Sequence, residues 1–161
     1  MNRIARRHLW TAAVCALLFL ARGALAAQGE DIAVIAHPDL PEDDLSLGQI
    51  RNVFLGERQY WKPSLRVTLL IRAPVARERE VVLKKIYRMN EGQFRQYWIA
   101  KVFRADTVSG PKIVYSNAMA TQLVAAIPGS ITFVAASQVP AGAKVLKIDG
   151  LLPGQDEYAL R

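Results

Sequence analysis

Most of the residue sets that perform catalysis are missing from this sequence. Beyond residue 26 the chain contains one histidine, His37, and no cysteine, because its single cysteine is Cys15. Neither a Gly-x-Ser-x-Gly nucleophile elbow nor a glycine-rich phosphate-binding loop occurs. A nucleophilic triad could be built only around His37, and a histidine beside a proline in a loop is expected to be a surface residue. We predict that the protein is not an enzyme and uses no cofactor.

An acidic run, Glu42, Asp43 and Asp44, has the oxygen ligands that a hard cation prefers. The run comes just before a predicted helix, whose positive N-terminal end stabilises negative charge nearby. We therefore interpret these carboxylates as part of a helix start and predict no metal site.

The segment with binding chemistry is 72–77, Arg-Ala-Pro-Val-Ala-Arg. A strand is predicted to end at Arg72 and a helix to follow, and in open α/β sheets ligands collect outside the carboxyl ends of strands. Free N–H groups at a helix start, with the guanidinium groups of Arg72 and Arg77 nearby, would favour an anion. Ser116 and Asn117, at the start of a later helix, are further candidate ligand-binding residues. The alternative is that both arginines are solvated surface residues.

Hydrophobic periodicity predicts the elements that would position these residues. Expected strands span 32–36, 66–71, 131–135 and 144–148, and expected helices begin near 47, 77, 91 and 117. Ser46 with Gln49, and Asn90 with Gln93, are capping-box pairs at two of the helix starts. The inner face of the last helix is expected to contain Met119, Leu123 and Ile127. The inner face of the helix that begins near 91 is expected to contain Phe94, Tyr97, Trp98 and Val102. The tail from residue 150 is expected to be irregular. This alternation favours an α/β layer structure with a largely parallel sheet.

The first 26 residues are predicted to be a secretory signal peptide. Basic residues precede an uncharged apolar run at 9–20, and Ala24-Leu25-Ala26 supplies a small-x-small cleavage pattern. The run is shorter than the roughly 18 residues of a membrane span, so a retained anchor is the weaker alternative. Arg6 and Arg7 partly resemble a twin-arginine signal, which leaves the export route open. The expected location is the periplasm, without stable membrane insertion after cleavage.

The remaining residues, 27–161, are predicted to form one domain of 135 residues. They carry 17 lysines and arginines against 14 acidic residues, a net charge of +3, because four arginines lie in the predicted leader. No long basic run remains, so nucleic acid is not an expected partner. Without cysteines, this domain must be stabilised by its hydrophobic core alone.

The order and spacing of several short motifs resemble the phosphate-type substrate-binding proteins of ABC transporters, specifically their short single-lobe relatives. The resemblance covers most of residues 31–150. It implies one lobe of the type II periplasmic-binding-protein fold, in which a mostly parallel sheet is flanked by helices. The matching residues are Phe54-Leu55-Gly56, Trp61, Arg72, Tyr97-Trp98, Phe103, Pro111, Val124, Pro128-Gly129, Ile131 and Lys144-Val145-Leu146.

The resemblance also implies how an oxyanion would be held. In full-length members an arginine and a Ser-Gly-Thr cluster at a helix start bind the ligand between two lobes. Arg72 takes the arginine position here, whereas the cluster falls on Ala76, Arg77 and Glu78. Two hypotheses follow: a periplasmic solute-binding-like protein that binds a small, phosphate-like anion near Arg72, or a ligand-free interaction module that docks an ABC transporter or membrane sensor.

Overall fold

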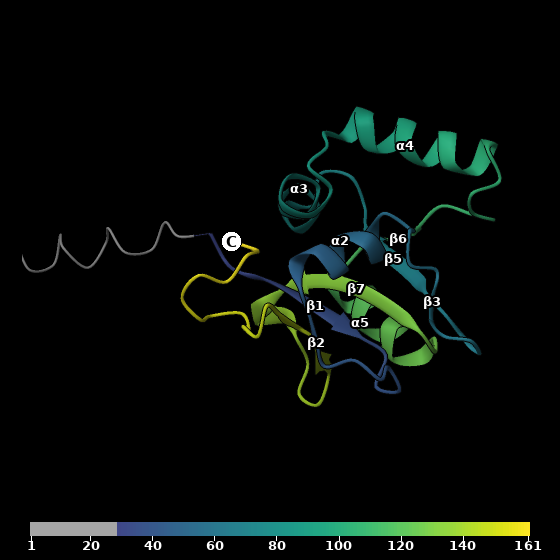
Figure 1. Ribbon diagram of the computed structural model, residues 1–161. Coiled ribbons are helices and arrows are strands. Elements are labelled where there is room, and N and C mark those ends of the chain that lie inside the picture. The colour runs from purple at the N-terminus through teal and green to yellow at the C-terminus, as the bar shows by residue number, and fades with distance from the viewer. Residues whose placement is uncertain (1–28) are drawn as a thin grey trace, which may run out of the picture.

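The computed structural model describes residues 29–161, which form an α/β layer structure around a five-stranded sheet (Figure 1). The predicted signal peptide lies outside the described residues. No helix within 29–161 combines the length and apolar character that crossing a membrane requires.

The central sheet has the spatial order β6-β5-β7-β1-β8. β5 runs parallel to β6 and β7, whereas β1 runs antiparallel to β7 and β8. The sheet is therefore mixed with a parallel core, and the first strand is the one that runs against the others. Its strands are β1 (Ile32–Ala36), β5 (Thr68–Arg72), β6 (Lys112–Val114), β7 (Ser130–Ala135) and β8 (Lys144–Val145).

Two small sheets extend this framework. β2 (Asp44–Leu45) pairs in parallel with β9 (Lys147–Ile148), and β3 (Tyr60–Lys62) forms an antiparallel hairpin with β4 (Leu65–Arg66). The strand expected at 144–148 is thus divided between two sheets. Its residue Leu146 is fully buried between the two halves.

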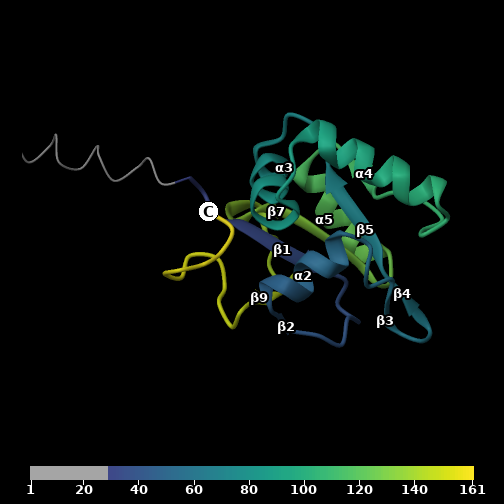
Figure 2. The ribbon, with the colours of Figure 1, turned by 45° about the horizontal axis from the view of Figure 1, so that its top comes forward.

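Three helices cover one face of the sheet and a fourth covers the other (Figure 2). The first face holds α2 (Leu47–Phe54), α3 (Arg77–Val82) with the π-helical turn η1 (Leu83–Tyr87), and α4 (Glu91–Phe103). α5 (Asn117–Ala126) covers the second face. Both predicted capping boxes are confirmed, because each cap side chain accepts from the N3 amide and each N3 glutamine accepts from the cap amide. A short 3₁₀ turn, η2 (Ala136–Gln138), follows β7.

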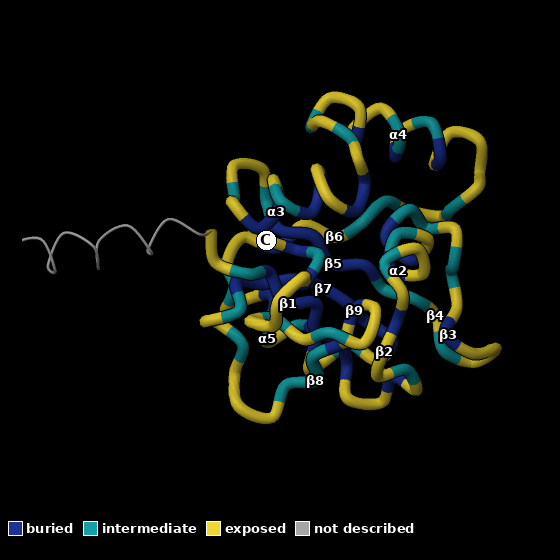
Figure 3. Tube along the Cα trace, turned by 60° about the vertical axis from the view of Figure 1, so that its left-hand side comes forward, coloured by how far each residue is buried: buried dark blue, intermediate teal, exposed yellow. Residues whose placement is uncertain are grey.

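The two covered faces explain why the central strands are apolar throughout. Every residue of β1 and of β7 is buried, as Figure 3 shows for the middle of the sheet. Along β5 the side chains alternate, so that Ile71 packs in the larger core beneath α2, α3 and α4, whereas Leu70 packs against α5. This alternation sets the direction of the residue that follows them, Arg72.

Two details of the sequence-based expectation are wrong. The buried face of α5 consists of Ala120 and Val124, whereas Met119 is 37% exposed, because the small Ala120 side chain lets the helix approach the sheet closely. On α4, Val102 is 43% exposed. As predicted, residues 150–161 are irregular and form turns and bends. This tail is nevertheless anchored, because Leu160 is fully buried and its carbonyl accepts from the Ile32 amide at 2.9 Å, beside the start of β1 (Figure 2).

Candidate functional site

Arg72 is the last residue of β5, at the carboxyl end of the parallel part of the sheet. Its side chain lies on the same face of the strand as that of Leu70, toward α5. Only 8% of the residue is exposed to solvent. The guanidinium therefore lies in the junction between the end of the strand and the first turn of α5.

The hydrogen bonds of Arg72 leave most of its donors without a protein partner. Nη1 donates to the Val114 carbonyl at a long 3.4 Å, and that oxygen already accepts from the Ala73 amide at 2.8 Å. Nε is buried and has no partner among the described residues. No described carboxylate lies within ion-pair distance of this guanidinium. A buried cation without a counter-charge is costly, because its hydration is lost and not replaced.

A carboxylate and an amide occupy the same strand-to-helix junction. Glu78, in the first turn of α3, is 8% exposed and its Oε1 accepts from Nδ2 of Asn117 at 2.8 Å. The Oδ1 atom of Asn117 is buried without a partner within residues 29–161. Asn117 is three residues beyond Val114, the acceptor of Arg72, so these groups share one end of the sheet. The site therefore offers an unsatisfied donor on Arg72 and an unsatisfied acceptor on Asn117.

The other two predicted site residues are engaged elsewhere. Ser116 caps α5, and its Oγ accepts from the Met119 amide at 3.0 Å. Arg77 is exposed, and its Nη2 donates to the Glu30 carbonyl at 2.6 Å, so its guanidinium faces the N-terminal segment. Of the four predicted residues, the structure brings Arg72 and Asn117 to a common region. The structure adds Glu78 to this region, a residue that the resemblance aligns only with the family's Ser-Gly-Thr cluster.

The turn between Arg72 and α3 has an unusual backbone. Val75 has φ 68° and is fully exposed. A positive φ is rare for any residue with a Cβ and is a genuine outlier for a β-branched one, because its side chain crowds the adjacent carbonyl. Strained turns of this kind concentrate at functional sites. The neighbouring cap residue, Ala76, has no side-chain hydrogen bond to the helix start.

A second buried arginine, Arg79, was not singled out in the sequence. It is 4% exposed, and its guanidinium forms a two-pronged ion pair with Glu91, with N–O distances of 2.9 and 2.7 Å. Nη1 also donates to the Arg72 carbonyl at 2.7 Å, and the group lies 4.8 Å from the Phe94 ring centre. The hydrogen bond from Arg79 lowers the pKa of Glu91. A signal was present, because Arg79 shares a helical face with the buried residues Val82 and Ile86.

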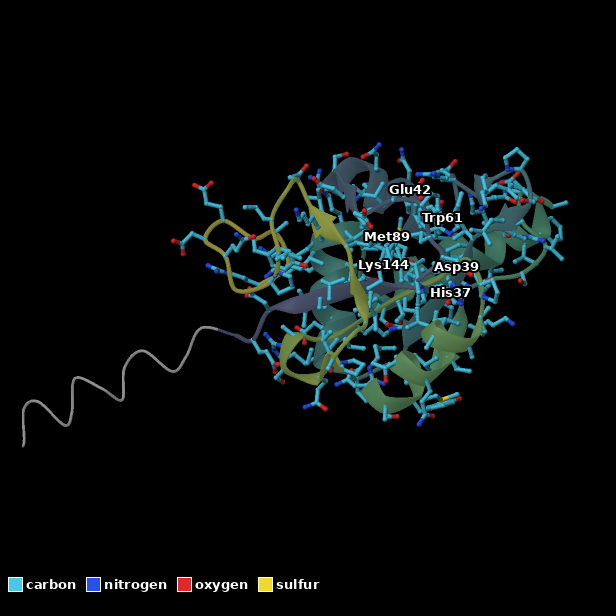
Figure 4. The ribbon with its side chains drawn as sticks, turned by 90° about the horizontal axis from the view of Figure 1, so that it is seen from below. His37, Asp39, Glu42, Trp61, Met89 and Lys144 are labelled. Carbon is cyan, nitrogen blue, oxygen red and sulfur yellow. The ribbon has the colours of Figure 1, made fainter. Side chains whose placement is uncertain are left out.

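His37 and the acidic run are bound within local structure (Figure 4). His37 is 9% exposed, so the expectation of a surface residue is wrong: it follows β1 directly, and its Nδ1 accepts from the Asp39 amide at 3.1 Å. Glu42 pairs with Arg58, Asp43 pairs with Lys144 at 2.8 Å, and Asp44 accepts from the Gly150 amide. The three carboxylates thus have three separate partners.

Comparison with solved structures identifies the fold. A protein assigned as a phosphate ABC transporter substrate-binding protein of Clostridium perfringens, solved with bound phosphate, superimposes with a TM-score of 0.62 and 19% identity over 77% of this chain. A phosphate transport receptor of Vibrio cholerae (15% identity, 77% of this chain) and PstS of Borrelia burgdorferi (14%, 81%) give the same TM-score. This chain has the fold of one substrate-binding-protein lobe. It spans 47%, 48% and 54% of those three chains, about half of each.

No protein-family model and no curated protein matches the chain. Arg72 lies at a strand end that faces a helix start, the kind of position at which open α/β sheets commonly bind ligands.

Proposed function

We propose that this chain is a periplasmic, single-lobe solute-binding protein that holds a small anion at Arg72. The observation that carries the proposal is the buried guanidinium with an unpartnered Nε and no carboxylate within ion-pair distance. An oxyanion there would supply the missing acceptor and counter-charge. Two of the three solved neighbours described above have phosphate in their names, which supports oxyanions as the ligand class.

The buried Glu78 limits which anions fit. Its carboxylate would repel a fully ionised dianion, but it would accept a hydrogen bond from a ligand that keeps a proton. These groups therefore favour a monoanion with both an acceptor and a donor, such as dihydrogen phosphate or a small hydroxy acid. Removing this charge without removing the hydrogen bond from Asn117 should strengthen the binding of anions in general.

Isothermal titration calorimetry of residues 27–161 with phosphate, sulfate and small hydroxy acids tests the proposal. We expect binding that Arg72→Gln abolishes and that Glu78→Gln strengthens several-fold. Arg77→Gln is the matched control, because it removes the same charge from a guanidinium that faces Glu30, and it should change affinity less than twofold. Absence of heat for every anion, with unchanged melting temperatures, would remove the proposal.

A specific observation favours a second candidate function, the docking of a membrane transporter or sensor. Ile99, Val102 and Phe103 of α4 are 56%, 43% and 90% exposed, and Ile113 of β6 is 46% exposed. These four residues, the α4 patch, line adjoining hollows that meet at Trp98 and Ile99. Contiguous exposed apolar surface is typical of protein interaction sites.

Charge indicates the kind of surface that would cover the α4 patch. Arg95 lines the hollow beside it and forms no ion pair with any residue of 29–161. Arg104, which follows Phe103 directly, already pairs with Asp106 at 2.9 Å. A partner with apolar residues and acidic residues at their rim fits best. Affinity capture from the envelope fraction should return one partner, and Phe103→Asp should lose it while keeping the anion affinity. Capture that Phe103→Asp leaves unchanged would exclude this surface.

A further inference from the structure

A pocket lies at the opposite end of β5 from Arg72. Its volume is about 230 Å³, and it is bounded by the end of α2, the β3–β4 hairpin and the segment 107–112. All of its lining residues belong to the described range 29–161, and none of them is acidic. The polar side chains include three cations and three hydroxyls: Arg58, Arg66, Lys112, Thr68, Thr107 and Ser109. We propose that this pocket binds a small dianionic oxyanion.

The net charge of the pocket comes from two of its three cations. Arg58 is committed, because it pairs with Glu42 and lies 4.8 Å from the Trp61 ring centre. Arg66 and Lys112 are exposed and form no ion pair with any residue of 29–161. Two uncompensated positive charges around one hollow attract a dianion. The protein walls replace part of the surrounding water, so the attraction is screened less than it would be on an open surface. The charge of this pocket thus differs from that of the Arg72 site, because the buried Glu78 carboxylate occupies the same strand-to-helix junction as Arg72.

The shape of the pocket is fixed by backbone and aromatic contacts. Gly56 has φ 68°, and a Cβ there would come within 2.9 Å of the Trp98 ring. Only glycine fits at this position, and its absent side chain leaves the floor open. The side-chain Nε2 of Gln59 donates to the backbone carbonyl of Asp106 at 2.8 Å. This hydrogen bond connects the start of the hairpin to the 104–109 segment. The hollow is therefore held by structure that needs no ligand.

Volume decides the size of the ligand. Pockets for drug-sized ligands usually measure about 300–1,000 Å³, and a water molecule takes about 30 Å³. This hollow has room for roughly seven waters. It suits inorganic phosphate, sulfate or a short dicarboxylate together with a few waters.

The pocket is independent of the proposed anion site. Thr68 lines the pocket and Arg72 ends the same strand four residues later, so the two sites are about 13 Å apart at 3.3 Å per residue. Each site can consequently be occupied or emptied without the other.

Nitrogen-15 NMR titration separates the two sites. At constant ionic strength, added sulfate or hydrogen phosphate should shift the amides of Gly56 and Gly110, which line this pocket, in saturable curves. Lys112→Gln and Arg66→Gln should each weaken this affinity about fivefold, the effect of losing roughly 1 kcal/mol of attraction. Arg72→Gln should leave both glycine curves unchanged. In a parallel titration with dihydrogen phosphate below pH 7, the monoanion that the proposed function favours should shift Ala73 and Asn117, and Arg72→Gln should remove those shifts.

The control is Arg95→Gln, which removes an exposed cation of α4 that lines a different hollow. It should change the affinity at Gly56 less than twofold, and Gly56 is the reporter for this control because Gly110 also lines the hollow beside Arg95. The proposal is overturned if the glycine amides do not respond to either dianion, or if Arg95→Gln weakens the response as much as Lys112→Gln does. Backbone spectra of all variants establish that each is folded. If the glycine amides do not respond but Ala73 still responds to dihydrogen phosphate, the pocket proposal is wrong and the proposed function at Arg72 is unaffected.

Discussion

Arg72 and Arg79 are seven residues apart and similarly buried, at 8% and 4% exposure, yet their surroundings are opposite. Arg79 has a two-pronged carboxylate partner, a carbonyl acceptor and an aromatic ring against its face. Arg72 has one long hydrogen bond and an unpartnered Nε. They are also connected, because the acceptor for Arg79 is the carbonyl of Arg72.

The difference separates a structural charge from a charge available to a ligand. A buried ion stabilises a fold only when protein groups replace its hydration, which Glu91 and the Arg72 carbonyl do for Arg79. No comparable group of acceptors surrounds the Arg72 side chain, so its N–H donors are available to a ligand after folding. Four substitutions can break or sharpen this comparison.

The largest effect is expected for Arg79→Met. It would leave the Arg72 carbonyl without its donor and Glu91 without its partner, so the free energy of unfolding should fall by about 3 kcal/mol. Urea denaturation followed by circular dichroism measures this loss. Arg95→Met, on the exposed surface of α4, is the control and should cost less than about 0.5 kcal/mol. Equal losses of unfolding free energy in Arg79→Met and Arg95→Met would contradict a structural role for Arg79.

Glu91→Gln should lower the free energy of unfolding at pH 7 by about 1.5 kcal/mol, since one partner of a charged hydrogen bond is lost. Because Arg79 lowers the pKa of Glu91 in the folded state, this stability is present above the ordinary value of 4.5. It is lost as the pH falls through the lower, folded-state pKa. Unfolding measured from about pH 7 down to pH 3 should show a smaller acid loss in Glu91→Gln than in the wild type. Parallel pH profiles would contradict the pairing.

Arg72→Met should have the opposite sign from Arg79→Met. In a buffer without oxyanions the free energy of unfolding should rise by about 1 kcal/mol, because an uncompensated buried charge is replaced by an apolar chain. The same variant should lose any rise in melting temperature that phosphate gives the wild type. A loss of about 3 kcal/mol would instead make Arg72 a structural residue like Arg79.

The smallest effect is expected at Val75, in the turn that joins the two arginines. Val75→Gly should raise the free energy of unfolding by about 0.5 kcal/mol, since relief of the positive-φ strain slightly exceeds the added chain entropy of glycine. Val75→Ala keeps a Cβ and should change stability less. Differential scanning calorimetry resolves the two variants. If glycine is destabilising, the Val75 side chain must form contacts that its full exposure does not indicate.

Local sequence information was sufficient for much of the fold. The capping boxes at Ser46 and Asn90, and the apolar runs of β1 and β7, specify their elements through neighbouring residues alone. Strand-helix alternation was likewise enough to predict the α/β class. The short strands β2, β3 and β6 were missed, because two or three residues give no periodicity and exist only through their pairing partners.

The sequence by itself determined that an arginine would stand at the end of a strand before a helix. It could not determine which nearby cation would be neutralised, because Glu91 reaches Arg79 across twelve residues and Asn117 reaches Glu78 across 39. Tertiary structure decided that Arg77 would face Glu30 and that Arg66 and Lys112 would meet around one hollow. Charges act through space and lose most of their hydration only on folding, so the fate of each one depends on packing that no local pattern contains.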